Sequence, residues 1–327
     1  MNKITINVSP HLVAGMDTRS MMKGVIKALI PAIVAGVYFF RGQALGVMVA
    51  SVLGCVLTEY LFQTARKRKV EIKDYSAVVT GLLLAMILPP ALPLWMAFLG
   101  GAFAIGMGKE LFGGLGHNIF NPALLARAFL MAAFPIALTT WTVPITLDAM
   151  TTATPLGLAK FTHSFTPSAQ LFMGNVGGSL GETCAVALIA GFIYLLWKKI
   201  IDYRIPVAYA ATLLLFSGVT YMIDPARFYP PVFCFLAGGF LIGAIFMATD
   251  PVTTPVTKKG RWIFGVGCGL ITMTIRVWGG LPEGVMYSIL FMNAFTPIIN
   301  RITGPRRYGV IKEKKIQCPV CLNKVEK

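Results

Sequence analysis

The residues best suited to chemistry lie in and beside one long polar segment, residues 139–177. Its centre reads Asp148-Ala149-Met150-Thr151-Thr152-Ala153-Thr154-Pro155. A proline disfavours the helical conformation of the residue before it, so Pro155 biases Thr154 toward extended backbone. We therefore expect the Thr154 hydroxyl to be presented outward, where another molecule can react with it. The alternative is that 139–177 is a Thr- and Pro-rich linker that runs over the surface of the protein.

A glycine-rich stretch follows and reads GNVGGSLGET from Gly174 to Thr183. Gly177 and Gly178 permit a close approach of the backbone to a neighbour. The stretch ends where a helix is predicted to begin, and a helix N-terminus offers free amide donors and the positive end of its dipole to an anion. Together with Ser179, these residues are a candidate anion pocket. The alternative is close packing of helices through small residues.

Three ionisable side chains fall at or inside strongly apolar segments. Glu182 is predicted in the first turn of a span, where a carboxylate serves an ion path or caps its helix; we favour the cap. Arg127 and Arg276 lie within spans and are expected to face the protein interior or water. Arg127 is a candidate to bind a phosphate or to pair with a carboxylate. Cys318 and Cys321 supply only two of the four ligands of a tetrahedral site, so no metal site is predicted.

The elements that position these residues are predicted to be membrane helices. Of 327 residues, 56% are hydrophobic and only 13% are charged, whereas soluble domains carry about 25% charged residues. This composition excludes a soluble single domain and a disordered chain. Ten segments are apolar enough to cross a bilayer: 24–40, 43–63, 76–90, 93–107, 121–138, 178–197, 205–223, 231–248, 262–278 and 284–300. The predicted fold is an all-α, polytopic integral membrane protein with about ten transmembrane helices.

The basic residues predict the orientation of these spans. If the N-terminus is cytoplasmic, 23 of the 29 lysines and arginines fall in inner loops or in the C-terminal tail. Only Arg41, Lys160 and Arg227 fall in outer loops. An excess of this kind on one side is the positive-inside pattern, and it predicts that both termini are cytoplasmic. The net charge of +16 is thus spread over loops, so a nucleic-acid partner is not predicted.

The two halves of the chain carry similar local signals. Asn121-Pro122 and Asp250-Pro251 both have the form of a helix start, and a glycine pair precedes each, at 100–101 and 238–239. The signals predict an inverted pair of five-helix repeats, 24–138 and 178–300, which is a transporter architecture. The outer loop 139–177 separates them, between a cytoplasmic segment 1–23 and a basic cytoplasmic tail 301–327. Chance recurrence of common caps is the alternative.

Four motifs resemble the RnfD and NqrB subunits of ion-translocating oxidoreductases. The first matches the family's flavin-attachment pattern at Asp148, Thr151, Ala153 and Thr154, and departs from it at Thr152, where the family usually has glycine. The others are the glycine-rich stretch 174–183, GGLGHNIFNPA at 113–123 and ATDPVTTP at 248–255. The resemblance covers roughly residues 24–300. It implies FMN held through a phosphoester on Thr154, with the flavin site drawn from these positions: Asp148, Thr151, Thr152, Ala153, Gly177, Gly178, Ser179, Glu182 and Arg127.

The resemblance also implies a function. The chain would be an electron-transfer subunit of a complex in the cytoplasmic (inner) membrane that couples ferredoxin and NAD chemistry to Na⁺ or H⁺ transport. Its flavin-bearing loop would lie on the outer face. Its partners would be the other Rnf subunits and a flavin transferase, and a non-covalent riboflavin would be a second cofactor. The short segment before the first span favours RnfD over NqrB, whose complex reduces quinone. A cofactor-free transporter or channel, or a scaffold subunit without redox function, are the alternatives.

Overall fold

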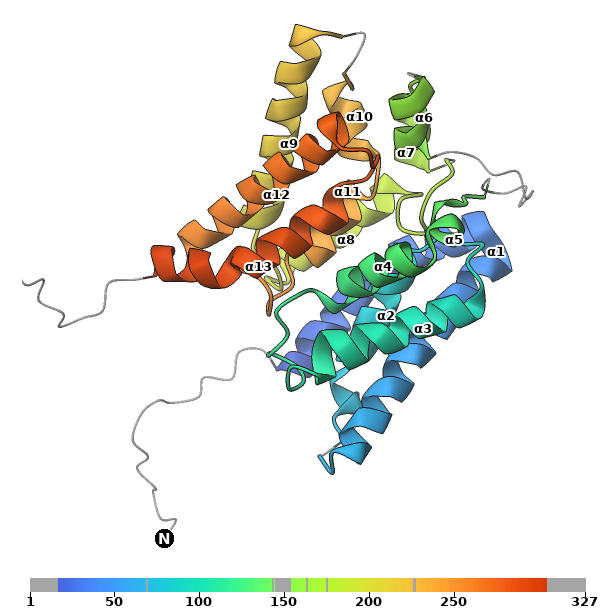
Figure 1. The fold of residues 1–327 in the computed structure, drawn as a ribbon, viewed down its shortest axis with the longest axis vertical. Coiled ribbons are helices and arrows are strands. Elements are labelled where there is room, and N and C mark those ends of the chain that lie inside the picture. The colour runs from blue at the N-terminus through green and yellow to red at the C-terminus, as the bar shows by residue number, and fades with distance from the viewer. Residues whose placement is uncertain are drawn as a thin grey trace, which may run out of the picture.

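The regular elements of the described residues are all helical in the computed structural model of the chain (Figure 1). The structure describes residues 17–68, 70–142, 144, 154–162, 164–174, 176–225 and 228–304. Within them, every predicted span contains at least one helix, which confirms the all-α prediction. Of the described helices, α1 (Thr18–Ala65) and α9 (Arg204–Ile223) are long and apolar enough, by length and composition, to cross a membrane. The ten-span topology and the orientation stay predictions.

The first half of the chain forms one group of helices (Figure 1). The predicted spans 24–40 and 43–63 are the two parts of α1, which breaks at Arg41 (φ 49°, ψ −130°). Next come α2 (Ser76–Met86), α3 (Leu94–Ile105), α4 (Pro122–Ala133) and α5 (Pro135–Thr139). A short 3-10 helix, Ile72–Asp74, precedes α2. Helix α3 packs closely on the second part of α1, because Gly54 and Gly101 leave no room for a side chain there.

The second half forms another group, drawn in yellow to red (Figure 1). It contains α8 (Ala185–Trp197), α9, α10 (Pro231–Leu236), α11 (Phe240–Ile242), α12 (Lys258–Trp278) and α13 (Val285–Thr303). Helices α9 and α12 pack along their length, with Gly265 against Ala208 and Gly269 against Thr212. The segment between the halves is not a plain loop, because it contains α6 (Pro155–Thr162) and α7 (Ser168–Met173).

Each half also contains a π-helical segment, Gly106–Glu110 in the first and Gly243–Met247 in the second. The helix start predicted at Asn121 is confirmed, since its side-chain oxygen accepts hydrogen bonds from the backbone of Ala123 (3.1 Å) and Leu124 (3.3 Å). The helix start predicted at Asp250 is wrong. Its side chain accepts a hydrogen bond from Val252 N within a turn (3.3 Å), and α12 begins only at Lys258, after Thr257 as its cap.

Candidate functional site

Thr154 is the N-cap of α6. Its Oγ1 accepts a hydrogen bond from the backbone N–H of Gly157 (3.1 Å), and its carbonyl accepts one from Leu158. Pro155 follows as the first helical residue, where a missing N–H costs nothing. The expectation of an outward-facing threonine is wrong, because Thr154 is only 5% exposed. Burial of its neighbours Leu156 and Ala159 in the core draws the start of α6 inward.

Thr154 lines a pocket of about 480 Å³. The pocket walls come from α4, from the end of α5 and the segment after it, from the start of α6, from the connection between α12 and α13, and from the first turn of α13. They comprise Arg127, Met131, Thr139, Trp141, Thr154, Leu281, Pro282, Glu283, Met286 and Tyr287. Binding pockets for cofactors typically have this character, with apolar and aromatic walls and a few polar groups.

An ion pair lies at the polar side of this pocket. Arg127 Nη2 and Glu283 Oε2 are 2.5 Å apart, and the two side chains are 7% and 19% exposed. Of the two roles foreseen for Arg127, the structure thus shows the pairing with a carboxylate. Glu283 was missed from sequence, since 156 positions separate the partners. The available signal was a lone carboxylate in the short predicted turn between the last two spans.

The described residues of the glycine-rich stretch, Gly174 and 176–183, do not line this pocket. The end of the stretch packs against the end of α2 instead. Gly181 N–H donates to Met86 O (2.6 Å) and Leu180 N–H donates to Leu88 O (3.3 Å). A Cβ at position 181 would lie 2.9 Å from Met86 O, so glycine is required for this approach. Close packing, the alternative foreseen for these glycines, is therefore what the structure shows at position 181.

Glu182 does not cap α8. The helix begins at Ala185, and its N-cap Cys184 makes no side-chain cap bond. The Glu182 carboxylate lies between two glycines instead: a Cβ would come within 2.8 Å of Oε2 at Gly178 and within 2.8 Å of Oε1 at Gly239. Glu182 is within electrostatic reach of both Glu283 and Arg127. The charges of Arg127 and Glu283 thus both act on Glu182.

Lys160 fastens α6 to the rest of the protein. Its ammonium donates to the carbonyls of Arg276 (3.2 Å), Gly279 and Leu281 (2.9 Å), which are left free where α12 ends. A cation is favoured there by the negative end of the helix dipole. Burial lowers the pKa of Lys160. The sequence identified Lys160 only as an outer-loop charge, yet it fixes the helix that carries Thr154.

Arg276 donates hydrogen bonds to the free carbonyls at a second helix end, that of α10. Its guanidinium is buried, and it donates to the carbonyls of Cys234 (2.7 Å), Ala237 (3.1 Å) and Gly238 (3.4 Å), between α10 and α11. Gly238 has a φ of +76° and lies against the Leu156 side chain of α6. Arg276 therefore faces the protein interior, as expected, and supports the surface on which α6 rests.

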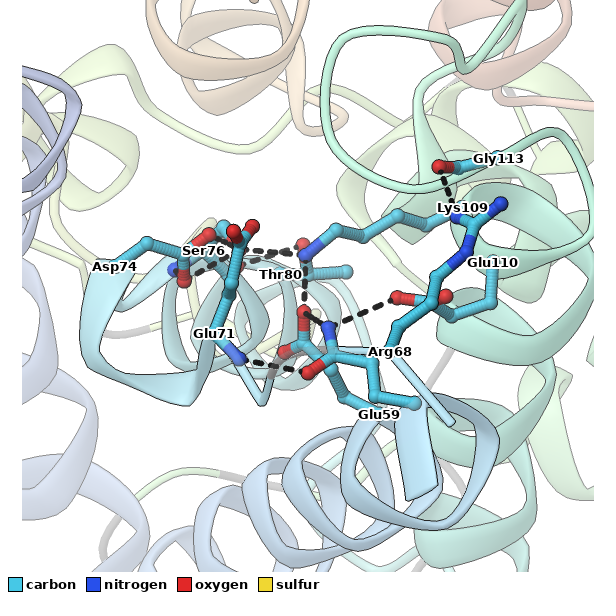
Figure 2. Close-up of polar contacts among 10 residues, drawn as sticks. Glu59, Arg68, Glu71, Asp74, Ser76, Thr80, Lys109, Glu110 and Gly113 are labelled. Atoms are coloured by element: carbon cyan, nitrogen blue, oxygen red, sulfur yellow. Dashed lines mark hydrogen bonds and ion pairs between the residues drawn. The ribbon is translucent and has the colours of Figure 1, made fainter. Parts of the chain in front are cut away.

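A separate polar cluster surrounds the first π-helical segment (Figure 2). Lys109 Nζ is 2.5 Å from Glu59 Oε1 and donates to Ser76 Oγ (2.6 Å), and Gln63 Nε2 bridges Glu59 and Glu110. The Lys109 and Glu59 side chains are buried, at 4% and 1% exposure. A polar cavity of about 760 Å³ adjoins the cluster.

A further cavity of about 790 Å³ lies between the two halves of the chain. Its walls are mainly apolar, and its polar groups include Asn118, Asn121, Thr249 and Asp250. Asn121 also donates to Met247 O of the second π-helical segment (3.3 Å). The two Asn/Asp-Pro motifs that the sequence singled out thus meet at one cavity.

Four predicted site residues of the attachment motif lie outside the described residues: Asp148, Thr151, Thr152 and Ala153. Cys318 and Cys321 of the tail lie outside them as well. The structure therefore places Thr154 and Arg127 on one pocket. Gly178, Ser179 and Glu182 lie in the segment before α8 and are not among the residues that line this pocket.

Comparison with known proteins identifies the family of the chain. The model of the NQR2, RnfD, RnfE family matches residues 5–309. The chain is 46% identical to a relative from Acetobacterium woodii, over 95% of this chain and 97% of the relative. It is 44% identical to a relative from Clostridium ljungdahlii, over 94% and 97%, and 37% identical to one from Stutzerimonas stutzeri, over 88% and 91%.

All three relatives are D subunits of redox complexes. In Acetobacterium woodii the complex is a Na⁺-translocating ferredoxin:NAD⁺ oxidoreductase, and in Clostridium ljungdahlii it is a proton-translocating ferredoxin:NAD⁺ oxidoreductase. In Stutzerimonas stutzeri it is an ion-translocating oxidoreductase. The chain therefore belongs to the NQR2, RnfD, RnfE family, and within it the similarity is to RnfD.

Proposed function

We propose that this chain is the membrane electron-transfer subunit of RnfD type in an Rnf complex, and that it carries FMN covalently on Thr154. The names of its relatives support the first part, since they are D subunits of ferredoxin:NAD⁺ oxidoreductase or ion-translocating oxidoreductase complexes. The reaction would be coupled to Na⁺ or H⁺ translocation across the cytoplasmic membrane. The other Rnf subunits would supply the sites for ferredoxin and NAD, and a flavin transferase would attach the FMN.

One observation carries the flavin proposal: the Thr154 hydroxyl lies at the start of α6 and on the wall of the 480 Å³ pocket. A phosphoester on this oxygen would place its negative charge against the first turn of a helix, where free amides and the dipole favour an anion. The pocket offers Trp141 and Tyr287 as aromatic walls for a planar ring system. The residues present thus fit an attached flavin.

When bound, FMN would supply one- or two-electron transfer, which suits a relay between other carriers. The chain's own residues have three tasks. Lys160 and Leu156 hold α6, so that Thr154 keeps its place on the pocket wall. The apolar walls at Met131, Leu281 and Met286 exclude water from the ring. The Arg127–Glu283 pair places fixed charges beside it, and such charges shift the stability of a charged ligand in a weakly polar site.

For a second, non-covalent flavin we propose the cavity between the two halves as the site, because it combines mainly apolar walls with a few polar groups, as cofactor sites typically do. Asn118, Asn121 and Thr249 would hydrogen-bond the polar edge of the ring system. Acid-denatured protein would then release unmodified riboflavin, and an Asn118→Leu variant would release less.

Intact-mass analysis of the purified chain tests the covalent proposal. We expect one FMN-sized increment and in-gel flavin fluorescence, both absent from Thr154→Ala. Thr139→Ala is the matched control, since Thr139 lines the same pocket and its hydroxyl bonds only to helix carbonyls. Loss of the increment in the control, or its persistence in Thr154→Ala, would show attachment elsewhere. Absence of any increment, in a host that modifies related proteins, would favour a cofactor-free transporter and implicate Thr152.

A further inference from the structure

Two buried polar groups in one turn of the glycine-rich stretch have no hydrogen-bond partner among the described residues. Ser179 is 0% exposed, and its Oγ is unpartnered. Glu182 is half-buried as a residue, but its Oε1 atom is buried and unpartnered as well. The turn is closed by a hydrogen bond from Glu182 N–H to Ser179 O (3.0 Å). The Ser179 hydroxyl lies near the Glu182 carboxylate, but no hydrogen bond joins them. Oxygen atoms left in this state usually mark a missing ligand, proton or water.

The surroundings of the carboxylate are narrow and come from two interrupted helical regions. Gly178 precedes α8, and Gly239 stands at the break between α10 and α11 with a φ of +64°. A Cβ on either glycine would come within 2.8 Å of a Glu182 oxygen. In membrane transporters, ion sites are typically built where discontinuous helices meet. The position of Glu182 between two such breaks is of this kind.

The charged groups around Glu182 do not neutralise the negative charge of its carboxylate. Arg127 is the one cation that acts on Glu182 appreciably, among the residues that the structure describes, and it is already paired with Glu283 at 2.5 Å. Glu283 itself repels a charge on Glu182. A carboxylate removed from water without its own counter-charge is strongly disfavoured. A bound cation or a proton would remove this penalty.

We propose that Ser179 and Glu182 form a buried site for a monovalent cation, taken up as Na⁺ or as a proton. The carboxylate supplies the charge and the hydroxyl a second hard oxygen ligand. The Arg127–Glu283 pair connects this site electrostatically to the pocket of Thr154. The inference rests on the proposed ion-translocating function and names the residues that would hold the ion beside the flavin.

The thermal stability of the full chain in detergent tests the site. A Na⁺ titration at pH 8, with choline at constant ionic strength, and a pH series from 6 to 9 without Na⁺ distinguish the two cations. For a Na⁺ site, Na⁺ raises the unfolding temperature and Glu182→Gln abolishes the rise. For a proton site, Na⁺ has no specific effect, stability falls as pH rises because Glu182 loses its proton, and Glu182→Gln removes this dependence. A Glu182→Gln chain that responds to Na⁺ and pH as the unaltered chain does overturns the proposal.

Ser179→Ala provides a second test, in case Glu182→Gln fails to fold. Since Ser179 Oγ has no partner among the described residues, its removal should leave the stability in choline unchanged, while the apparent Kd for Na⁺ rises by about tenfold, or ~1.4 kcal/mol. Loss of stability in choline with an unchanged Na⁺ response would instead show a structural serine. Glu71→Gln, the same change at an exposed carboxylate, is the control. The titration is repeated in Thr154→Ala to separate the cation site from the flavin. The response of Glu182 to Na⁺ or pH should persist in this variant, because it does not require FMN on Thr154.

Discussion

The ion pair between Lys109 and Glu59 yields the sharpest quantitative prediction (Figure 2). The nitrogen and oxygen are 2.5 Å apart, and the side chains are 4% and 1% exposed. Lys109→Met removes the charge and keeps most of the side-chain volume. Glu59 would then be buried without a counter-charge, and its Oε2 already has no hydrogen-bond partner among the described residues.

Loss of one partner from such a pair costs about 3–5 kcal/mol of folding free energy, most of it from the stranded charge. Replacement of both partners by methionine avoids this cost. The double variant Glu59→Met/Lys109→Met should therefore lie within about 1–2 kcal/mol of the unaltered chain. Gln63 would keep its other contact, to Glu110 (3.3 Å), in both variants. A coupling of roughly 3 kcal/mol or more between the two positions is expected from the cycle.

Equilibrium unfolding by SDS in mixed micelles measures these differences. Lys258→Met is the control, because Lys258 is an exposed lysine and surface changes stay within about 0.5 kcal/mol. If Lys109→Met costs less than about 1 kcal/mol, water reaches Glu59 and the description of this pair as buried is refuted. A double variant as unstable as the single one would show that Lys109 stabilises through packing and not through charge.

Two further predictions concern the supports of the Thr154 pocket and of Glu182, and a third concerns the ion pairs of Asp202. Lys160→Met should destabilise the chain by about 1–2 kcal/mol in thermal unfolding, because three carbonyls at and after the end of α12 lose a donor. It should also lower the fraction of chains that carry the FMN mass increment. Lys160→Arg should restore both the stability and this fraction. Gly239→Ala should cost about 1–3 kcal/mol, given its φ of +64° and the nearby Glu182 oxygen, whereas Gly218→Ala, with open space around it, should not destabilise. Burial alone would raise the pKa of Asp202, but hydrogen bonds from the Arg204 backbone and from the Arg261 and Arg204 side chains outweigh it and lower the pKa. This stabilisation is present above about pH 4, the ordinary Asp range, and is lost as pH falls through the lowered pKa; the acid branch of a stability–pH curve should flatten in Asp202→Asn.

The sequence alone indicated the helical class, the positions of most helices and the family. Long apolar segments and their proline and glycine boundaries are local signals, so they are readable residue by residue. The cap at Asn121 is of the same kind, because its side-chain oxygen accepts from Ala123 and Leu124, two and three positions away. The motif ending at Thr154 and the arginine at 127 were also identified and assigned to one flavin site, and both line one pocket in the structure. Glu283, the partner of Arg127, was not identified.

Short helices inside the long polar segment were missed for a physical reason. Helices as short as α6 and α7 do not form on their own, because helix nucleation costs free energy and a short helix forms too few hydrogen bonds to offset it. Helix α6 forms because Leu156 and Ala159 are buried and because Lys160 binds the end of α12, 116 or more positions away. The same packing turns Thr154 inward, where local preference predicted an exposed residue.

The sequence by itself thus determined which residues can ionise or react and which segments are helical. The tertiary structure decided which of these residues are paired. Arg127 meets Glu283 and Lys109 meets Glu59 across 156 and 50 positions, while Glu182 is placed between two glycines with no cation of its own among the described residues. Such pairings depend on how helices cross, and crossing is set by packing over the whole chain. Burial then makes each pairing, or its absence, energetically important, because the interior screens charges far less than water does.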